Sequence, residues 1–285
     1  NTGIGLVTAR QLAAQGAHVF IACRSQARAA DAIAHIERQH PGARVEALVL
    51  DLGDFGSVRS CAQAFLARDL PLHLLINNAG LAGARGMTAS GFEIAFGVNH
   101  MGHFLLTQLL LPRLRQSAPA RIVTVASRAH ERVPGIDWDA VQKPTKTRVA
   151  LHEYGVSKLA NVLFSAELAK QLAGSGVTTY ALHPGVVASE VWREVPWPIE
   201  PLMKWFMLTP EEGARTTLYC ATSAAAGGET GLYYDKSRAV TPGGAGRDPE
   251  LAAELWRRSQ AFVAAAAGSS AVSGPAASAL EAAPR

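Results

Sequence analysis

Apolar residues along the chain follow two alternating patterns, one with the three-to-four-residue spacing of helices and one with the nearly continuous runs of buried strands. The helical spacing predicts helices over Leu6–Gln15, Ala27–Gln39, Phe92–Leu114, Glu153–Leu172 and a segment that begins at Thr209. The apolar runs predict strands at His18–Cys23, Val45–Asp51, Leu72–Asn77, Ile122–Ala126, Val177–His183 and Gly231–Asp235. This alternation predicts an α/β fold, in which helices cover a parallel sheet.

Two predicted helix ends carry local signals. Gly16 follows the first helix at a position suited to a left-handed cap. Thr209 is a typical N-cap residue, with Pro210 at the first helical position and Glu212 placed to close a capping box. A helix is therefore expected to begin directly after Thr209.

The last part of the chain has a different composition. After Val263 the residues are almost all Ala, Ser, Gly and Pro, with hardly any large apolar side chain. Such a segment cannot bury enough surface to offset the entropy of ordering, so residues 263–285 are predicted to be a disordered tail. The 285 residues then divide into a single domain over 1–262 and this tail.

Charge and cysteine usage narrow the class of protein. The net charge is +4, but the basic residues are scattered and rarely interleaved with aromatic residues, which indicates a solvated surface and no nucleic-acid partner. Cys23, Cys61 and Cys220 have no paired spacing, so neither a disulfide framework nor a zinc site is predicted. No apolar run reaches the roughly 18 residues of a membrane-spanning helix, and no signal-peptide pattern opens the chain. A place in the cytoplasm, or peripheral to a membrane, is expected.

Gly3 and Gly5 lie at the start of the first predicted helix. Where side chains are missing, a phosphate can approach the backbone N–H groups and the positive end of the helix dipole. Glycines before a helix also serve simply as turns, so this pair alone leaves both interpretations open.

The end of the next predicted strand carries Cys23 followed by Arg24. In a dinucleotide-binding fold this position reads the adenosine ribose. An acidic residue would accept from the 2′-hydroxyl, whereas the Arg24 guanidinium suits a 2′-phosphate, which favours NADP(H) over NAD(H). A solvent-facing arginine is the alternative. Asp51, which ends the following strand, suits either an adenine amino group or the role of a helix N-cap or turn residue.

Tyr154 and Lys158 lie four residues apart at the start of a predicted helix. Residues at this spacing share a face, so the ammonium can lie beside the phenol. A free phenol has a pKa of about 10, and a neighbouring cation favours phenolate, so Lys158 is expected to lower the pKa of Tyr154 towards a range useful for acid–base catalysis. The same spacing also occurs by chance on amphipathic helices.

Several motifs occur in one order over nearly the whole chain: Asn1–Gly5, Ala22–Arg24, Asp51–Leu52, Asn77–Gly80, Val98–Thr107, Val125–Ser127, Tyr154–Lys158 and His183–Gly185. Together they resemble the short-chain dehydrogenase/reductase superfamily, and within it the retinol-dehydrogenase-like branch. The resemblance implies a Rossmann-type, doubly wound parallel sheet. It also implies an oxidoreductase that moves hydride between NADP(H) and an alcohol or carbonyl.

The resemblance further implies a catalytic tetrad of Asn99, Ser127, Tyr154 and Lys158. Tyr154 would exchange a proton with the substrate oxygen, and Ser127 would hydrogen-bond that oxygen and stabilise its charge. Lys158 would lower the Tyr154 pKa and hold the nicotinamide ribose, and Asn99 would anchor a water of a proton relay. Besides Tyr154 and Lys158, the implied cofactor contacts are Asn1, Thr2, Gly3, Ile4, Arg24, Asp51, Leu52, Asn78, Ala79, Gly80, Pro184, Gly185, Val187 and Ser189.

The start of the chain departs from the family pattern. The sequence opens on Asn1, without the family's first strand and the first glycine of its phosphate loop, and that strand lies in the middle of the family's sheet. We expect a gap between two half-sheets, fewer backbone donors for the pyrophosphate and weak cofactor binding. We interpret the sequence as a truncated form of a longer enzyme, and any membrane anchor before Asn1 would be missing with it.

Residues 188–210 match the family's mobile substrate lid. Within them, Val191–Met207 gathers three of the five tryptophans among prolines, so we expect a small apolar substrate, isoprenoid-like or steroid-like. The same aromatic residues also suit a subunit interface, as in a homodimer, or contact with a membrane surface.

The function predicted is an NADP(H)-dependent oxidoreductase that works as a carbonyl reductase in a reducing cytoplasm. The alternative is a catalytically silent NADP(H)-binding module that signals redox state or scaffolds a partner, but such a module has no need of both Tyr154 and Lys158. His100 and His103 are three apart on a predicted helix. Because no carboxylate or third ligand lies nearby in the sequence, they are assigned to packing and capping, and no metal site is predicted.

Overall fold

The computed structural model describes residues 1–186 and 208–272, with side chains up to residue 267. Its α-helices are α1 (Gly3–Ala14), α2 (Gln26–Gln39), α3 (Phe55–Leu66), α4 (Ile94–Phe96), α5 (Gly102–Gln116), α6 (Leu151–Gln171), α8 (Pro210–Thr222) and α9 (Pro249–Val272). Short π or 3-10 helices are η1 (Gly97–Met101), η2 (Arg128–Arg132), η3 (Ala140–Gln142) and η5 (Gly244–Arg247). The strands are β1 (Val19–Cys23), β2 (Val45–Val49), β3 (Leu74–Asn77), β4 (Ala120–Val125), β5 (Val177–His183), β6 (Leu232–Asp235) and β7 (Arg238–Val240).

The predicted parallel α/β architecture is confirmed, and so is the gap in its sheet. β1 pairs with β2 in one parallel sheet, while β3, β4, β5 and β6 follow one another in parallel in a second sheet that β7 closes in antiparallel fashion. No hydrogen-bond ladder joins β1 to β3 among the described residues. The sheet therefore consists of two halves.

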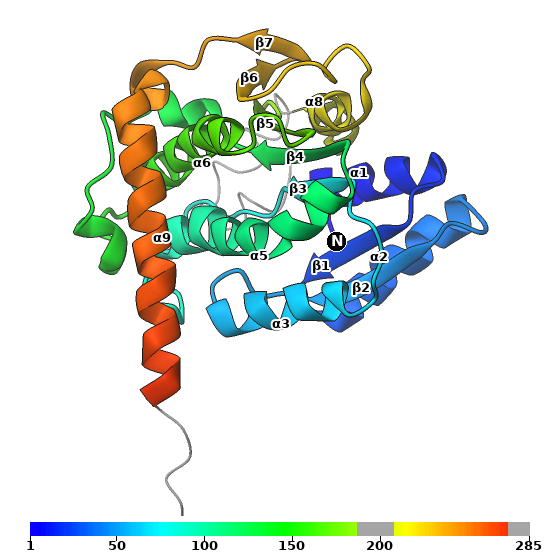
Figure 1. Cartoon of the computed structure of the whole chain (residues 1–285), viewed down its shortest axis with the longest axis horizontal. Coiled ribbons are helices and arrows are strands. Elements are labelled where there is room, and N and C mark those ends of the chain that lie inside the picture. The colour runs from blue at the N-terminus through cyan, green and yellow to red at the C-terminus, as the bar shows by residue number, and fades with distance from the viewer. Residues whose placement is uncertain (187–207, 273–285) are drawn as a thin grey trace, which may run out of the picture.

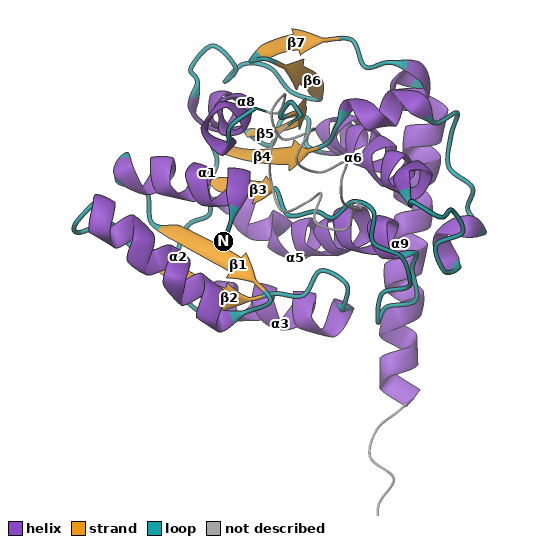
Figure 2. Ribbon diagram, turned by 180° about the vertical axis from the view of Figure 1, so that it is seen from behind, coloured by secondary structure: helices purple, strands orange, loops and turns teal. Residues whose placement is uncertain are grey.

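Helices cover both faces of the two half-sheets (Figure 1). On one face α1 packs against α8, and α2 packs on β1 and β2. On the other face α3 packs against α5, and α6 lies along β4 and β5. Seen from behind, α9 runs outside α6 and α5 and extends past the body of the protein (Figure 2).

The helix predicted over Phe92–Leu114 is continuous over Ile94–Gln116, but its second segment, η1, is a π-helix. In the described part of the chain this helix alone is long and apolar enough to cross a membrane. Its apolar window is 72% buried inside the protein, because α3, α6 and α9 surround it, so it is a core helix here.

The structure corrects the prediction of a disordered tail from residue 263. α9 continues to Val272, and Phe262, Val263 and Ala266 pack against the core. Compositional reasoning overlooked that alanine is the best helix former, so an alanine run extends a helix that is already anchored. The anchor is Trp256, which stacks on Phe164 with 6.1 Å between ring centroids. Residues 273–285 lie outside the described part.

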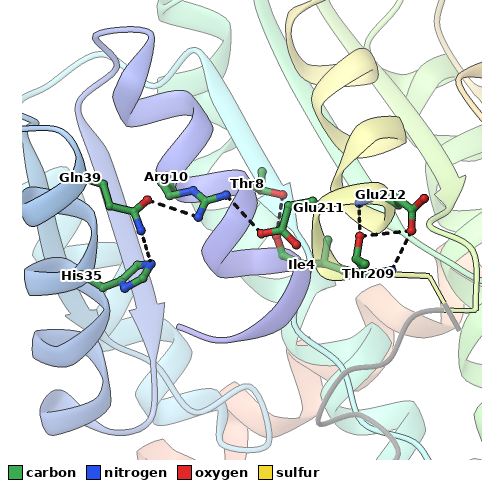
Figure 3. Close-up of polar contacts among 8 residues, drawn as sticks. All are labelled: Ile4, Thr8, Arg10, His35, Gln39, Thr209, Glu211 and Glu212. Carbon is green, nitrogen blue, oxygen red and sulfur yellow. Dashed lines mark hydrogen bonds and ion pairs between the residues drawn. The ribbon is translucent and has the colours of Figure 1, made fainter. Parts of the chain in front are cut away.

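The predicted capping box at the start of α8 is confirmed (Figure 3). Thr209 Oγ1 accepts from the Glu212 N–H at 3.2 Å, and Glu212 Oε2 accepts from the Thr209 N–H at 2.9 Å. In the same turn Glu211 forms an ion pair of 3.3 Å with Arg10 of α1, and Arg10 also donates to Gln39 of α2. These contacts connect α8 with the first half of the chain.

We expect Thr209→Ala to lower the free energy of unfolding by about 1 kcal/mol, because the N–H of Glu212 loses its acceptor at the helix start. Equilibrium denaturation measures this loss. Glu211→Gln is the matched control: it breaks an ion pair whose carboxylate is 57% exposed, so its effect should stay below about 0.5 kcal/mol. An equal loss in both variants would show that the capping box is not the stabilising feature.

Candidate active site

A cavity of about 2270 Å³ runs between β1 and β3 and along the carboxyl ends of β3, β4 and β5. This is the edge where doubly wound sheets bind their ligands. The described residues of the predicted cofactor set all line it: Asn1, Thr2, Gly3, Ile4, Arg24, Asp51, Leu52, Asn78, Ala79, Gly80, Tyr154, Lys158, Pro184 and Gly185. Val187, Ser189 and the lid up to residue 207 lie outside the described residues.

The start of α1 has the geometry of an anion site. Gly3 has a φ of 51°, a conformation that favours glycine, and Thr2 before it is extended. A Cβ on Gly5 would come within 2.8 Å of Asn78 Nδ2, so a larger residue would displace the Asn78 side chain at the end of β3. The first N–H groups of the helix have no acceptor within it and face the cavity, which fits a pyrophosphate.

Arg24 and Asp51 line the same cavity. Arg24 is exposed, and the next residue, Ser25, is the N-cap of α2 and accepts from the Arg28 N–H. Asp51 Oδ1 accepts from the Gly53 N–H at 2.9 Å, so Asp51 stabilises its own turn as well as lining the cavity. Asp51 is therefore a turn residue, and the N-cap of α3 is Asp54.

Tyr154 lies in the first turn of α6 and is only 7% exposed. Ser127, which follows the end of β4, hydrogen-bonds the phenol. Burial raises the pKa of Tyr154 above its ordinary value of 10, and the Ser127 hydrogen bond offsets part of that rise. At neutral pH the phenol therefore keeps its proton.

Lys158 lies one helical turn further along α6 and is also buried. Its Nζ donates to the Val125 carbonyl at 2.9 Å and lies 5.6 Å from the centre of the Tyr154 ring. Burial lowers the pKa of Lys158 to about 8. The pKa of Tyr154 is thus not brought below its ordinary value in this geometry, because burial is its largest influence.

Asn99, the fourth predicted member of the tetrad, lies behind the cavity wall in η1. Its Nδ2 donates to the Leu81 carbonyl and to Ser157 Oγ, each at 2.9 Å, and its Oδ1 accepts from the Leu81 N–H. A Cβ on Gly80 would lie 3.2 Å from Asn99 Oδ1 and 3.4 Å from Lys158 Nζ. Asn99 therefore approaches Lys158 across a glycine and holds the loop after β3.

Two groups that hold the site were missed by sequence reasoning. Ser157 bridges Asn99 and the backbone of Tyr154, since its Oγ also donates to the Tyr154 carbonyl at 2.8 Å. The sequence signal that could have found Ser157 is its position between Tyr154 and Lys158 in the motif. The Val125 carbonyl, which accepts from Lys158, is a backbone group, and no residue type announces it.

The two helical histidines have the packing roles that the sequence indicated. His100 Nε2 lies 3.0 Å from Ser259 Oγ of α9, and His103 Nδ1 lies 3.0 Å from the Asn99 carbonyl. Burial lowers the pKa of His100 to about 3 and that of His103 to about 4, so both rings are neutral at pH 7.

A profile of the family described as short chain dehydrogenase matches residues 1–197, more than half of the chain. The chain belongs to this family. It is therefore an oxidoreductase that acts on alcohol or carbonyl groups with NAD(P)(H), and its likeness to retinol dehydrogenases places it in that branch of the short-chain dehydrogenases.

Similar proteins cover most of this short-chain dehydrogenase. Human retinol dehydrogenase 12 is 44% identical over 264 residues, which are 90% of this chain and 81% of the relative. The crystal structure of a putative uncharacterized protein from Mycobacterium paratuberculosis is 33% identical with a TM-score of 0.72, over 92% of this chain and 90% of that one. The RhlG/NADP active-site complex of Pseudomonas aeruginosa is 30% identical with a TM-score of 0.64, over 81% of this chain and 90% of that one.

Proposed function

We propose that this short-chain dehydrogenase is an NADP(H)-dependent oxidoreductase that interconverts an apolar alcohol and its aldehyde or ketone. The observation that carries the proposal is the meeting of Ser127, Tyr154 and Lys158 in one cavity, opposite a helix start suited to a pyrophosphate. Serine, phenol and ammonium together supply what the oxygen of a carbonyl needs: a hydrogen bond, a proton and a positive charge.

When bound, NADP(H) supplies or accepts the hydride, and the described residues that would hold it are Gly3 to Gly5, Arg24, Asn78 and Lys158. In reduction, the Tyr154 hydroxyl gives its proton to the carbonyl oxygen, while the Ser127 hydroxyl donates a hydrogen bond to the same oxygen. Tyr154 is left as phenolate beside the Lys158 ammonium, which stabilises the new charge. In oxidation the same groups act in reverse order.

The protonation state of Tyr154 supports reduction as the working direction. Because burial raises the pKa of Tyr154, the phenol carries the proton that a carbonyl requires, whereas oxidation would first need its removal. Lys158, with a pKa of about 8, is mostly charged at neutral pH. The resting site is therefore set to protonate a carbonyl oxygen.

Exposed apolar side chains that line the cavity support an apolar substrate. Met87, Leu151 and Val186 line it and are 40%, 47% and 51% exposed, although large apolar side chains are usually buried. They lie on three separate parts of the chain and line the same cavity as Tyr154. A hydrocarbon group beside the carbonyl would cover them and gain their burial.

The test follows the oxidation of NADPH, and separately of NADH, at 340 nm with a panel of apolar aldehydes and ketones. Cofactor is supplied at millimolar concentration, because the split sheet predicts weak binding. Turnover of apolar carbonyls with NADPH supports the proposal. Tight NADPH binding in calorimetry without turnover of any compound would instead favour the silent NADP(H)-binding module.

The proposed preference for NADPH depends on Arg24. We expect Arg24→Gln to weaken NADPH binding by roughly 10- to 100-fold, because one charge-assisted hydrogen-bond pair to the 2′-phosphate is lost, and to leave NADH binding nearly unchanged. Arg38 in the last turn of α2 provides the control, since Arg38→Gln removes the same charge away from the cavity. Equal weakening of both cofactors by Arg24→Gln would contradict a 2′-phosphate contact.

A further inference from the structure

Ser127 lies at the N-terminal end of the short helix η2, and this helix is held by parts of the chain distant in sequence. On one side it packs against α6, where a Cβ on Gly155 would come within 3.0 Å of the Ala129 carbonyl. On another side η5 lies so close that a Cβ on Gly243 would come within 2.8 Å of Glu131. The Ser127 hydroxyl itself accepts from the Ala129 N–H at 3.2 Å. The position of Ser127 is thus decided by what η2 contacts.

The strongest polar contact of η2 is an ion pair with the end of β6. Arg128 Nε donates to Asp235 Oδ2 at 2.8 Å, and a second nitrogen of the guanidinium contacts the same oxygen. Asp235 is only 9% exposed in its side chain, whereas Arg128 is 58% exposed. A carboxylate this buried needs a cationic partner, so the pair draws Arg128, and with it the residue next to Ser127, onto β6.

A second contact ties the same two elements. His130 is fully buried, its Nδ1 lies 2.6 Å from the Ser127 carbonyl, and its ring meets the Tyr233 ring edge to face at 5.0 Å. Tyr233 and Asp235 both belong to β6, and Asp235 pairs in register with His183 of β5 at the cavity. β6 therefore acts as the support against which the serine turn is placed.

We propose that Arg128 and Asp235 are positioning residues, which hold the Ser127 hydroxyl in hydrogen-bonding reach of the Tyr154 phenol and of the substrate oxygen. Arg128 bonds to Asp235, and Ser127 hydrogen-bonds Tyr154, so we assign the pair an action through Ser127. The catalytic consequence rests on the proposed function. The geometric part, the distance between Ser127 and Tyr154, does not.

The experiment compares Arg128→Gln, Asp235→Asn and the double variant with the wild-type chain. We expect kcat to fall roughly 10- to 100-fold, because a displacement of about 1 Å at a reacting group has that effect, and KM for NADPH to stay unchanged. The double variant should lose no more than either single one, since both remove the same pair. Arg113→Gln is the control: it breaks the 2.8 Å ion pair with Asp69 on another part of the surface.

A second readout requires no turnover. Because the Ser127 hydrogen bond lowers the pKa of Tyr154, its loss should raise that pKa in Arg128→Gln and Asp235→Asn, and leave it unchanged in Arg113→Gln. Tyrosine-labelled NMR titration, with Tyr154→Phe to assign the signal, measures it. An unchanged Tyr154 titration, or unchanged kcat with a lowered melting temperature, overturns the inference and leaves a pair that only stabilises the fold.

Two further comparisons keep the outcomes separate. Arg128→Lys keeps the positive charge, so we expect this variant to fold even where the neutral variants do not. It lacks the guanidinium fork, so we expect a partial loss of kcat. Wild-type kcat in Arg128→Lys together with an unchanged Tyr154 pKa would overturn the positioning role. A wild-type chain without turnover defeats the proposed function alone, because the titration of Tyr154 still tests the geometry.

Discussion

Tyr154→Phe should abolish carbonyl reduction and leave the fold and the binding of NADPH intact. The substitution removes one oxygen, the only atom of the side chain that can give a proton to the substrate. General acid catalysis contributes on the order of 100- to 10,000-fold in rate, and the phenylalanine variant should lose a factor in that range. Ser127 and Lys158 would remain in place, since Lys158 is held by the Val125 carbonyl and not by the phenol.

The measurement is kcat with NADPH and the most active carbonyl of the panel, beside NADPH affinity from fluorescence titration. Tyr219→Phe is the matched control, because it removes the same oxygen from α8, outside the residues that line the cavity. A Tyr154→Phe variant that keeps wild-type kcat would exclude Tyr154 as the proton donor. A variant that also loses NADPH binding would show that the phenol holds the cofactor instead.

Lys158→Met should make the chain more stable at pH 7 while it removes turnover. The ammonium of Lys158 is buried, and its pKa is lowered from 10.5 to about 8, so the folded state carries a charge that it disfavours. A shift of this size corresponds to about 3 kcal/mol. Part of that gain is offset because Lys158 no longer donates to the Val125 carbonyl. The Asn161 side chain still donates to this carbonyl, so the loss is small and we expect a net gain on the order of 2 kcal/mol.

The way in which the stability difference between Lys158→Met and the wild-type chain changes with pH provides a sharper test. Below about pH 8 the lysine is charged in both the folded and the unfolded chain, so the cost of burying the charge is complete. Between pH 8 and 10.5 the folded chain binds fewer protons than the unfolded one, and wild-type stability rises with pH. The advantage of Lys158→Met is therefore largest at pH 7 and shrinks towards pH 10.5.

Urea denaturation of both chains at a series of pH values measures this difference. Lys170→Met is the control: Lys170 lies on the same helix but its side chain is 54% exposed in an ion pair with Glu167, so no comparable pH dependence is expected. An advantage of Lys158→Met that stays constant with pH would show that packing, and not the buried charge, is responsible. A destabilised Lys158→Met would mean that the hydrogen bond to Val125 outweighs burial.

Local signals in the sequence were reliable where neighbouring residues decide the outcome. The strands from β1 to β6 were predicted with ends that differ by two residues or fewer, because each is an apolar run bounded by polar residues. The Thr209 capping box also formed as predicted, since all its atoms lie within one turn. α3 was not predicted, because Gly56, Ser57 and Ser60 weaken its helical pattern, and its N-cap Asp54 was not recognised.

The site shows the opposite case. The spacing of Tyr154 and Lys158 placed both on one face of α6, but it did not reveal that the Val125 carbonyl takes the ammonium or that burial raises the phenol pKa. The Val125 carbonyl belongs to β4, 33 positions before Lys158, and burial results from the packing of the whole core. A pKa depends on every group packed around the titrating atom, and spacing along one helix describes only one of them.

The sequence by itself determined the α/β class, the order of strands β1 to β6 and the family, because hydrophobic period and motif order are properties of the chain. Only the tertiary structure decided how Ser127 meets Tyr154, that Arg128 reaches Asp235 more than a hundred residues away, and that α9 continues through an alanine-rich segment. These features depend on burial and on contacts between distant segments. Such contacts form only when the whole core packs, so no local pattern contains them.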